Sequence, residues 1–472
     1  MSACFVGYSL LEKYLMVPTA IEVADTHLPL YTFPFPTITV CPANKVKRSI
    51  ATKYLSEFFA PTNEKEATDV MWHIMSAFSL MQYPTYWRMK SHIKSVRDYL
   101  DYFSEINVTH FMITVLPKCD EIFQSCYWHG HTVDCCEIFS MQRTEEGFCY
   151  SFNSLTSAAN EHCPLSEVLE NEGVIEEDDV DWEGCVLRRN TATGTGTGLE
   201  FFLRKYPDSE QLGPEGQKDL DGISRFQILV HTSYEFPDTG TGFHVPYKFG
   251  SRLSVRIQPQ FTVSTDNIRA LSIQTRGCMF PDEELLNIYH VYTETSCLAE
   301  CRLHYILAMC KCRMYFFTVA DDSFPICGTQ HMLCVVKYSE NLRFVHPPHR
   351  MGFTENEIIE SLNCSCIPTC YDTEYDLEIG RSEDWHTAYQ HYAYVDIHYG
   401  NLGVVKYQRD ITFGWVDLLV SLGGVANLFL GFSLLSLLEI LYWLFLATNL
   451  FITGKDENNV INVKPVQSIY IE

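Results

Sequence analysis

The segment CLAECRLHYILAMCKC at residues 297–312, together with CSCIPTC at residues 364–370, decides how this chain folds. The first two cysteines of the longer segment are four residues apart in a predicted helix, so they share one helix face. The first two cysteines of CSCIPTC are two residues apart in an extended segment, so they also share a face, about 6–7 Å apart. Disulfide bridges can therefore join the helix to the extended segment at two successive levels.

The cysteine content of the whole chain favours disulfides over metal binding. Closely spaced cysteines can also bind zinc, but nineteen cysteines are typical of a chain that matures in an oxidising compartment. Two N-glycosylation sequons, at Asn107 and Asn363, fit the same compartment. The cysteine-rich region is therefore predicted to be extracellular.

Composition limits the possible function classes. The chain has 34 basic and 59 acidic residues, and 34 − 59 gives a net charge of −25. Such a surface repels nucleic acid and attracts small cations, although it also serves plain solubility. The sequence contains no nucleophile elbow, P-loop, zinc-protease helix or dinucleotide fingerprint, so we expect neither an enzyme nor a cofactor or metal site.

The C-terminal part of the chain is strongly apolar. Residues 418–438 contain no charged side chain, and after Glu439 the apolar run continues to Phe451. A bilayer core needs about 20 apolar residues in a helix, and few buried helices of soluble proteins are so apolar. The pattern predicts a membrane helix over residues 415–451 and a cytoplasmic tail over residues 452–472.

The N-terminal residues are apolar only as far as Glu12-Lys13 and lack the features of a signal peptide. We expect residues 1–12 to be the outer end of a first transmembrane helix whose beginning is missing here. Residues 13–414 then form the extracellular domain.

The extracellular domain mixes strand and helix patterns. Residues 47–116 have apolar side chains at helical spacing, and residues 119–185 are rich in cysteine. Strand patterns occur at residues 199–204, 226–231, 251–258, 392–399 and 402–407. These positions predict an α+β fold whose central sheet joins distant segments, with helical and cysteine-rich subdomains inserted between them.

Several motifs resemble the degenerin/epithelial sodium channel family, and within it the arthropod pickpocket branch. They are FPFPTITVC at 33–41, GFCYSFN at 147–153, the C-x3-C-x8-C-x-C set at 297–312, CSCIPTC at 364–370 and GGVANLFLGFSLLSLLEI at 423–440. The resemblance implies trimeric, sodium-permeable, amiloride-blocked channels in the plasma membrane. It also implies two transmembrane helices per subunit, cytoplasmic termini, and an acid-sensing-channel-like extracellular domain with a palm sheet and a thumb-like region at about 278–370.

The resemblance also implies disulfide partners. The implied pairs are Cys41–Cys149, Cys278–Cys370, Cys297–Cys366, Cys301–Cys364, Cys310–Cys334 and Cys312–Cys327. A seventh pair would join Cys126 to Cys135 or Cys136. Cys119, Cys163, Cys185 and the unused member of 135/136 are extra to the family pattern, and we expect two further bridges among them.

Pore residues follow from the same resemblance. Gly431, Phe432 and Ser433 match the Gly-x-Ser segment that forms the narrowest part of similar channels. A glycine allows close approach of backbones, and freed carbonyls can replace part of a cation's hydration shell, whereas small residues elsewhere often only pack helices together. Further candidates for pore lining or gating are Val420, Ser421, Gly424, Asn427 and Glu439.

Two functions remain open on the sequence. The first is a subunit of a homo- or heterotrimeric sodium channel that is gated by an extracellular ligand, protons or force. The second is a non-conducting regulatory or binding subunit of such a channel, which the incomplete first helix favours.

Overall fold

The computed structural model describes residues 2–16, 19–42, 44–59, 64–160, 163, 185–204, 207–210, 212, 225–246, 252–284, 286, 288, 291–318, 324–346, 352, 354–355, 358, 361–382, 392–431 and 433–453. Chain contacts divide it into two compact units. The larger unit contains residues 21–265 and 277–409, and the smaller unit contains residues 1–20, 266–276 and 410–472. The acidic segment 170–183 lies outside the described residues.

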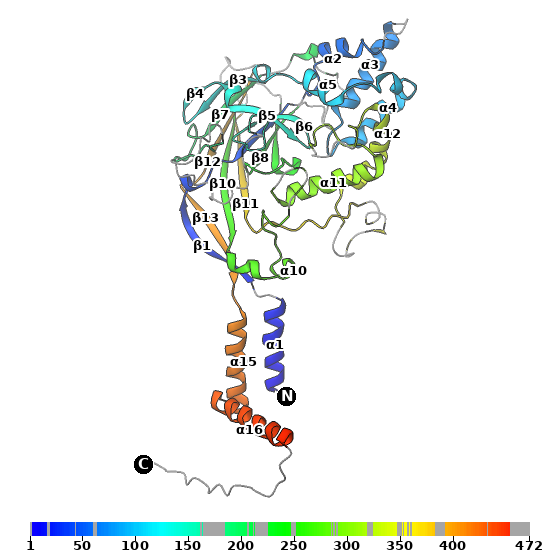
Figure 1. Cartoon of the computed structure of the whole chain (residues 1–472). Helices are drawn as coiled ribbons and strands as arrows, with labels where there is room; N and C mark the ends of the chain where they lie inside the picture. The colour runs from blue at the N-terminus through cyan, green and yellow to red at the C-terminus, as the bar shows by residue number, and fades with distance from the viewer. Residues whose placement is uncertain are drawn as a thin grey trace, which may run out of the picture. The chain divides into compact units, whose positions relative to one another are not determined.

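The first sheet of the larger unit joins segments from both ends of the chain. Its strand order is β1-β13-β10-β12-β7-β3-β4, and β11 pairs with β10 outside this order (Figure 1). The strands are β1 (Thr19–Pro29), β3 (Phe123–Trp128), β4 (His131–Val133), β7 (Leu199–Arg204), β10 (Arg252–Ser264), β11 (Asp372–Ser382), β12 (Tyr392–Tyr399) and β13 (Gly403–Ile411).

Strand β10 is the organising strand of this sheet. It pairs in parallel with β12 and β13 and antiparallel with β11, so that Val255 lies opposite both Ile397 and Ile379. Leu253, Val255 and Ile257 are buried, and the alternation follows the two-residue period of a strand. The strand predicted at 251–258 therefore exists and continues to Ser264.

The second sheet has the order β5-β6-β2-β8-β9. Its strands are β2 (Thr37–Cys41), β5 (Phe139–Thr144), β6 (Gly147–Phe152), β8 (Arg225–His231) and β9 (Gly242–Pro246). Phe35 is fully buried, and its ring packs edge-on against Trp128 and Tyr399 of the first sheet and Phe152 of the second. The FPFP motif therefore places an aromatic ring between the two sheets.

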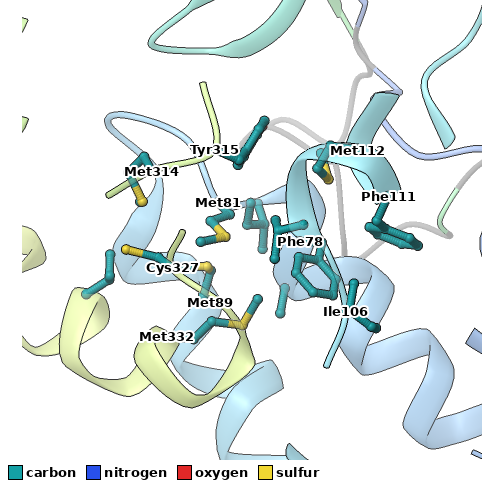
Figure 2. Close-up of a cluster of buried hydrophobic side chains, with 14 of the residues drawn as sticks. Phe78, Met81, Met89, Ile106, Phe111, Met112, Met314, Tyr315, Cys327 and Met332 are labelled. Atoms are coloured by element: carbon teal, nitrogen blue, oxygen red, sulfur yellow. The ribbon is translucent and has the colours of Figure 1, made fainter. Parts of the chain in front are cut away.

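Most helices of the larger unit share one core. They are α2 (Arg48–Leu55), α3 (Glu64–Ser79), α4 (Met89–Ser95), α5 (Val108–Val115), α11 (Glu294–Cys310), α12 (Thr329–Lys337) and α13 (Ser339–Arg343). The short helices α6 (Cys119–Ile122) and α7 (Cys135–Ile138) pack into the core of the sheets instead. Figure 2 shows Phe78 and Phe111 in one cluster of buried side chains with methionines from three different segments, Met89, Met314 and Met332. Because Met is flexible, it fills the irregular space between such short helices.

Disulfide bonds tie these elements together. The pairs are Cys41–Cys149, Cys119–Cys136, Cys126–Cys135, Cys163–Cys185, Cys278–Cys370, Cys297–Cys366, Cys301–Cys364, Cys310–Cys334 and Cys312–Cys327. They include the six pairs that the family resemblance implies, and Cys4 is free and exposed. Each bridge contributes about 2–4 kcal/mol to folding, mainly by restricting the unfolded chain.

The larger unit confirms the predicted α+β fold with a central sheet of distant segments. The sequence patterns missed strands β1, β9 and β11, and also the strands β3 to β6 within the cysteine-rich region. The smaller unit contains helices α1 (Ser2–Met16), α10 (Ile273–Arg276), α15 (Trp415–Leu430) and α16 (Leu434–Thr453). Helix α1 continues past residue 12, where the sequence pattern ended it.

Candidate pore segment

Helices α1 and α15 pack side by side in the smaller unit (Figure 1). A Cβ atom at Gly7 of α1 would lie 3.6 Å from Cδ2 of Leu422, so the glycine permits this close approach. The ammonium of Lys13 lies 5.1 Å from the centre of the Phe413 ring, a cation–π contact between the end of α1 and the start of α15.

Helix α15 has two different faces. Leu418, Val425 and Ala426 are half-buried, and helical spacing places them on the same side as Leu422, which contacts α1. The other face is exposed and includes the residues Val420, Gly424, Asn427 and Gly431. Four of the predicted pore residues therefore share one uncovered face. Ser421 lies between the two faces and is half-buried.

The structure divides residues 415–451, which were expected as one helix, between α15 and α16. Helix α15 ends at Leu430, and Gly431 adopts a left-handed conformation with φ +64° and ψ 22°. Its N–H donates to the Asn427 carbonyl at 2.9 Å. Glycine is the residue that adopts this conformation without steric cost, so it is a common helix stop.

Ser433 lies directly before the next helix, α16. Its hydroxyl accepts a hydrogen bond from Ser436 N at 3.3 Å, and its carbonyl accepts one from Leu437 N at 3.1 Å. Serine is a preferred N-cap residue, so Gly431 and Ser433 act as a stop signal followed by a start signal. The last carbonyls of a helix lack partners within the helix, so a break exposes oxygen atoms that can bind cations. Phe432 lies outside the described residues.

Two carboxylates belong to this region. Glu439 is exposed on α16. Asp417 lies in the first turn of α15, where its carboxylate accepts a hydrogen bond from Gly414 N at 2.9 Å. The helical spacing of Asp417 places it on the face of Val420 and Gly424. Sequence analysis missed Asp417, although an acidic residue three positions after a helix start is a recognised capping signal.

Among the residues that the structure describes, no helix is both long enough and apolar enough to cross a membrane. The predicted transmembrane helices therefore stay predictions. The predicted cytoplasmic tail lies outside the described residues from position 454 onward.

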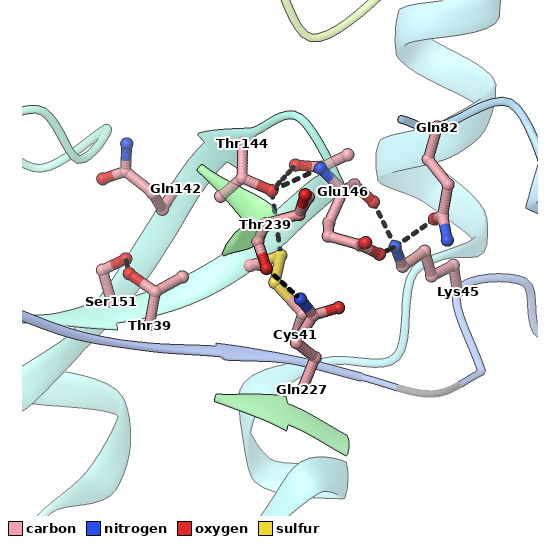
Figure 3. The surroundings of a disulfide bond; sticks show 12 residues. Thr39, Cys41, Lys45, Gln82, Gln142, Thr144, Glu146, Ser151, Gln227 and Thr239 are labelled. Carbon is pink, nitrogen blue, oxygen red and sulfur yellow. Dashed lines mark hydrogen bonds and ion pairs between the residues drawn. A yellow bond between two sulfur atoms is a disulfide. The ribbon is translucent and has the colours of Figure 1, made fainter. Parts of the chain in front are cut away.

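A buried ion pair stands next to the Cys41–Cys149 disulfide of the larger unit (Figure 3). The Lys45 ammonium lies 2.6 Å from a carboxylate oxygen of Glu146 and also donates to the Gln82 side chain and the Glu146 carbonyl. Burial lowers the pKa of Lys45, while Glu146 opposes this change. The contacts join the segment after β2 to the β5–β6 turn and to the segment after α3.

The adjacent residue makes a second buried pair. Both carboxylate oxygens of Glu145 accept hydrogen bonds from Nη1 of Arg302, at 2.6 and 2.7 Å. The Arg302 guanidinium also lies 4.0 Å from the centre of the Tyr83 ring. Burial raises the pKa of Glu145 to about 7, against the attraction of Arg302. The pair connects helix α11 to the β5–β6 turn.

Both predicted glycosylation sites are exposed. Asn107 is the N-cap of α5, and its Oδ1 accepts from His110 N at 3.1 Å, which leaves Nδ2 for a glycan. Asn363 lies directly before the bridged Cys364. Their glycosylation stays a prediction.

These features define a class of protein: a disulfide-bridged α+β domain whose two terminal segments form paired apolar helices, one of them interrupted at a glycine. A sequence profile described as "Amiloride-sensitive sodium channel" matches residues 1–443. The chain belongs to this family of ion channels, which are not enzymes, and the resemblance found in the sequence is confirmed.

Individual relatives support the same family. Sodium channel protein Nach of Drosophila ananassae is 24% identical over 437 residues, which cover 90% of this chain and 75% of that protein. Pickpocket protein 19 of Drosophila melanogaster is 23% identical over 434 residues, with coverage of 89% and 78%. Acid-sensing ion channel 2 of Danio rerio is 25% identical over 281 residues, with coverage of 55% and 47%.

Proposed function

We propose that this chain is a subunit of a trimeric, amiloride-sensitive, sodium-permeable cation channel of the plasma membrane. The subunit crosses the membrane more than once, carries the larger unit on the extracellular side, and assembles with copies of itself or with related subunits. An extracellular stimulus, which is a ligand, protons or force, opens the channel. The similarity to sodium channel protein Nach and to an acid-sensing ion channel supports this assignment.

The helix break at Gly431 is the observation that carries the proposal. An uninterrupted apolar helix would bind all its backbone carbonyls internally and offer no oxygen atoms to a cation. A stop at Gly431 and a start at Ser433 leave the last carbonyls of α15 without partners in that helix and place a hydroxyl two residues beyond Gly431. Three such segments around an axis would form a ring that replaces part of the hydration shell of Na⁺.

The two faces of α15 support the same pore. Because α1 covers one face, the exposed face with Val420, Gly424 and Asn427 is left for the pore. Asp417 stands one turn before Ser421 on the chain and would attract cations to the pore. Glu439 is proposed to face the water-filled part of the pore, since a carboxylate facing lipid is costly.

Expression of the full chain in oocytes tests the proposal, alone and together with a related pickpocket subunit. We expect a whole-cell current that disappears when a large organic cation replaces Na⁺ and that amiloride reduces. Gly431→Trp should abolish the current while surface biotinylation stays at the wild-type level.

Leu419→Trp is the matched control, because Leu419 is 63% exposed but lies on a different face of α15. It should leave the current in place. The proposal fails if surface-delivered wild-type chains carry no sodium current in either combination, or if Gly431→Trp conducts like the wild type.

A further inference from the structure

Two histidines of the larger unit face each other across neighbouring helices. His73 belongs to α3 and His92 to α4, and their Nδ1 atoms are 3.1 Å apart. The ring centroids are 5.3 Å apart and the ring planes are inclined by 59°. His92 is buried and His73 is half-buried, so one edge of the pair is open to solvent.

The surroundings hold both rings in place. The Trp72 ring packs edge-on against His73, with centroids 4.8 Å apart, and against His92, with centroids 5.2 Å apart. Helix α4 also packs on α12, and Met89 and Ile93 on either side of His92 are fully buried. Neither imidazole can therefore move far without disturbing the helical core.

The distance between the two nitrogens suits a metal ion as well as a proton. With one proton between them, one Nδ1 donates and the other accepts. Two imidazole nitrogens that bind one Zn²⁺ at about 2.0–2.1 Å lie about 2.8–3.4 Å apart, for bond angles between a right angle and a tetrahedral angle. The observed 3.1 Å falls in this interval. An ion can therefore replace the shared proton without a change in the separation of the two nitrogens, if both rings turn toward the ion.

We propose that His73 and His92 bind one divalent transition-metal ion of the zinc and copper type. Imidazole nitrogen is a ligand that both ions prefer. In the described part of the chain, no group of three or more His, Cys, Asp or Glu side chains is placed to hold a metal ion. Water molecules on the His73 side therefore complete the coordination.

The ligand set determines the character of the site. Structural zinc sites have four protein ligands, whereas this site has two and an open side, so the ion exchanges with solvent. The bound ion would join α3 to α4 and restrict the relative motion of the two helices. The site is thus suited to sensing an extracellular trace metal, and it does not depend on whether the chain conducts ions. No metal site was predicted from the sequence, because the histidines are nineteen positions apart.

Metal titration of the purified full chain in lipid nanodiscs tests the proposal. Calorimetry with Zn²⁺ should show one site per chain whose affinity falls at least about tenfold in His73→Gln and in His92→Gln. Copper(II) added at one equivalent should give a spin-echo spectrum with two imidazole ligands in the wild type and fewer in either variant. Zinc should also raise the thermal unfolding midpoint of the wild type but not of His73→Gln.

His110→Gln is the matched control, since His110 is exposed on α5 and outside the pair, and it should bind Zn²⁺ like the wild type. His73 is half-buried, so His73→Gln provides a result even if His92→Gln does not fold. The proposal is overturned if His73→Gln binds Zn²⁺ as tightly as the wild type. It is equally overturned if the wild type binds no more tightly than the double variant His73→Gln/His92→Gln.

Discussion

Replacement of Gly431 by alanine should change ion conduction only by altering the backbone conformation at this position. A Cβ atom at Gly431 would meet no other atom within 4 Å, so the change creates no clash within the subunit. The φ of +64°, however, is unfavourable for any residue with a Cβ atom and costs alanine about 1–2 kcal/mol. That energy shifts the balance from the broken helix to a continuous helix by a factor of about 5–30.

Gly423→Ala is the matched control for this prediction. Gly423 lies within α15, and a Cβ atom there also meets nothing within 4 Å. Inside a helix, alanine is more favourable than glycine by about 1 kcal/mol, so the same chemical change has the opposite sign. A third variant, Gly431→Asn, should resemble the wild type more closely, because asparagine tolerates the left-handed conformation better than alanine.

The assay is the sodium current and the relative permeability to Na⁺ and K⁺, normalised to the amount of chain at the surface. We expect Gly431→Ala to lower the current and alter selectivity, Gly423→Ala to leave both unchanged, and Gly431→Asn to fall between them. Wild-type current and selectivity in Gly431→Ala at equal surface level would refute the role of the helix break.

Two further predictions concern the larger unit. Burial lowers the pKa of His231 to about 4, and its ring nitrogens contact Thr39 Oγ1 at 2.8 Å and the Thr232 carbonyl at 2.7 Å. Because the unfolded pKa is about 6.5, the stability that neutral His231 confers is present above pH ~6.5 and is lost as pH falls toward ~4, by about 2 kcal/mol between pH 7.5 and 5. Burial raises the pKa values of Glu145 and Glu235 to about 7, and these two groups therefore make the fold more stable as pH falls. To separate the contribution of His231, thermal unfolding of the wild type should be compared with that of His231→Gln at both pH values. Equal changes of the unfolding midpoint in the two proteins would contradict this prediction. Arg302→Ala leaves the Glu145 carboxylate buried without its partner and should destabilise the fold by about 3–5 kcal/mol, which thermal unfolding would detect. Arg302→Met/Glu145→Gln should recover part of this loss, and a double variant as unstable as Arg302→Ala would contradict the assignment.

Local sequence patterns were sufficient to predict those strands in which buried residues recur at regular spacing. The alternation of β10 and the apolar run of β12 identified both strands, because each buries residues that recur along its length. Strand β1 gave no such signal, since most of its residues are exposed on both faces and only pairing with β13 makes it a strand. Strand β11 likewise depends on its partner β10.

In the candidate pore too, some features could be predicted from the sequence and others required the structure. Hydropathy located the apolar segment, and the motif located Gly431 and Ser433 within it. Hydropathy did not predict the separation of α15 from α16, because it averages over many residues and does not register a single left-handed glycine followed by an N-cap serine. The distinction between the covered and exposed faces of α15 required α1 to be placed beside it.

The sequence by itself determined the disulfide-rich α+β character of the chain, its apolar terminal segments and its family, because cysteine spacing, hydropathy and motifs are local or ordered along the chain. Only the tertiary structure decided which polar residues meet across large separations. Arg302 reaches Glu145, and His73 faces His92, because distant elements pack together and force polar groups to find partners away from water. Contacts of this kind produce no periodic pattern in the sequence, because they arise from packing in three dimensions.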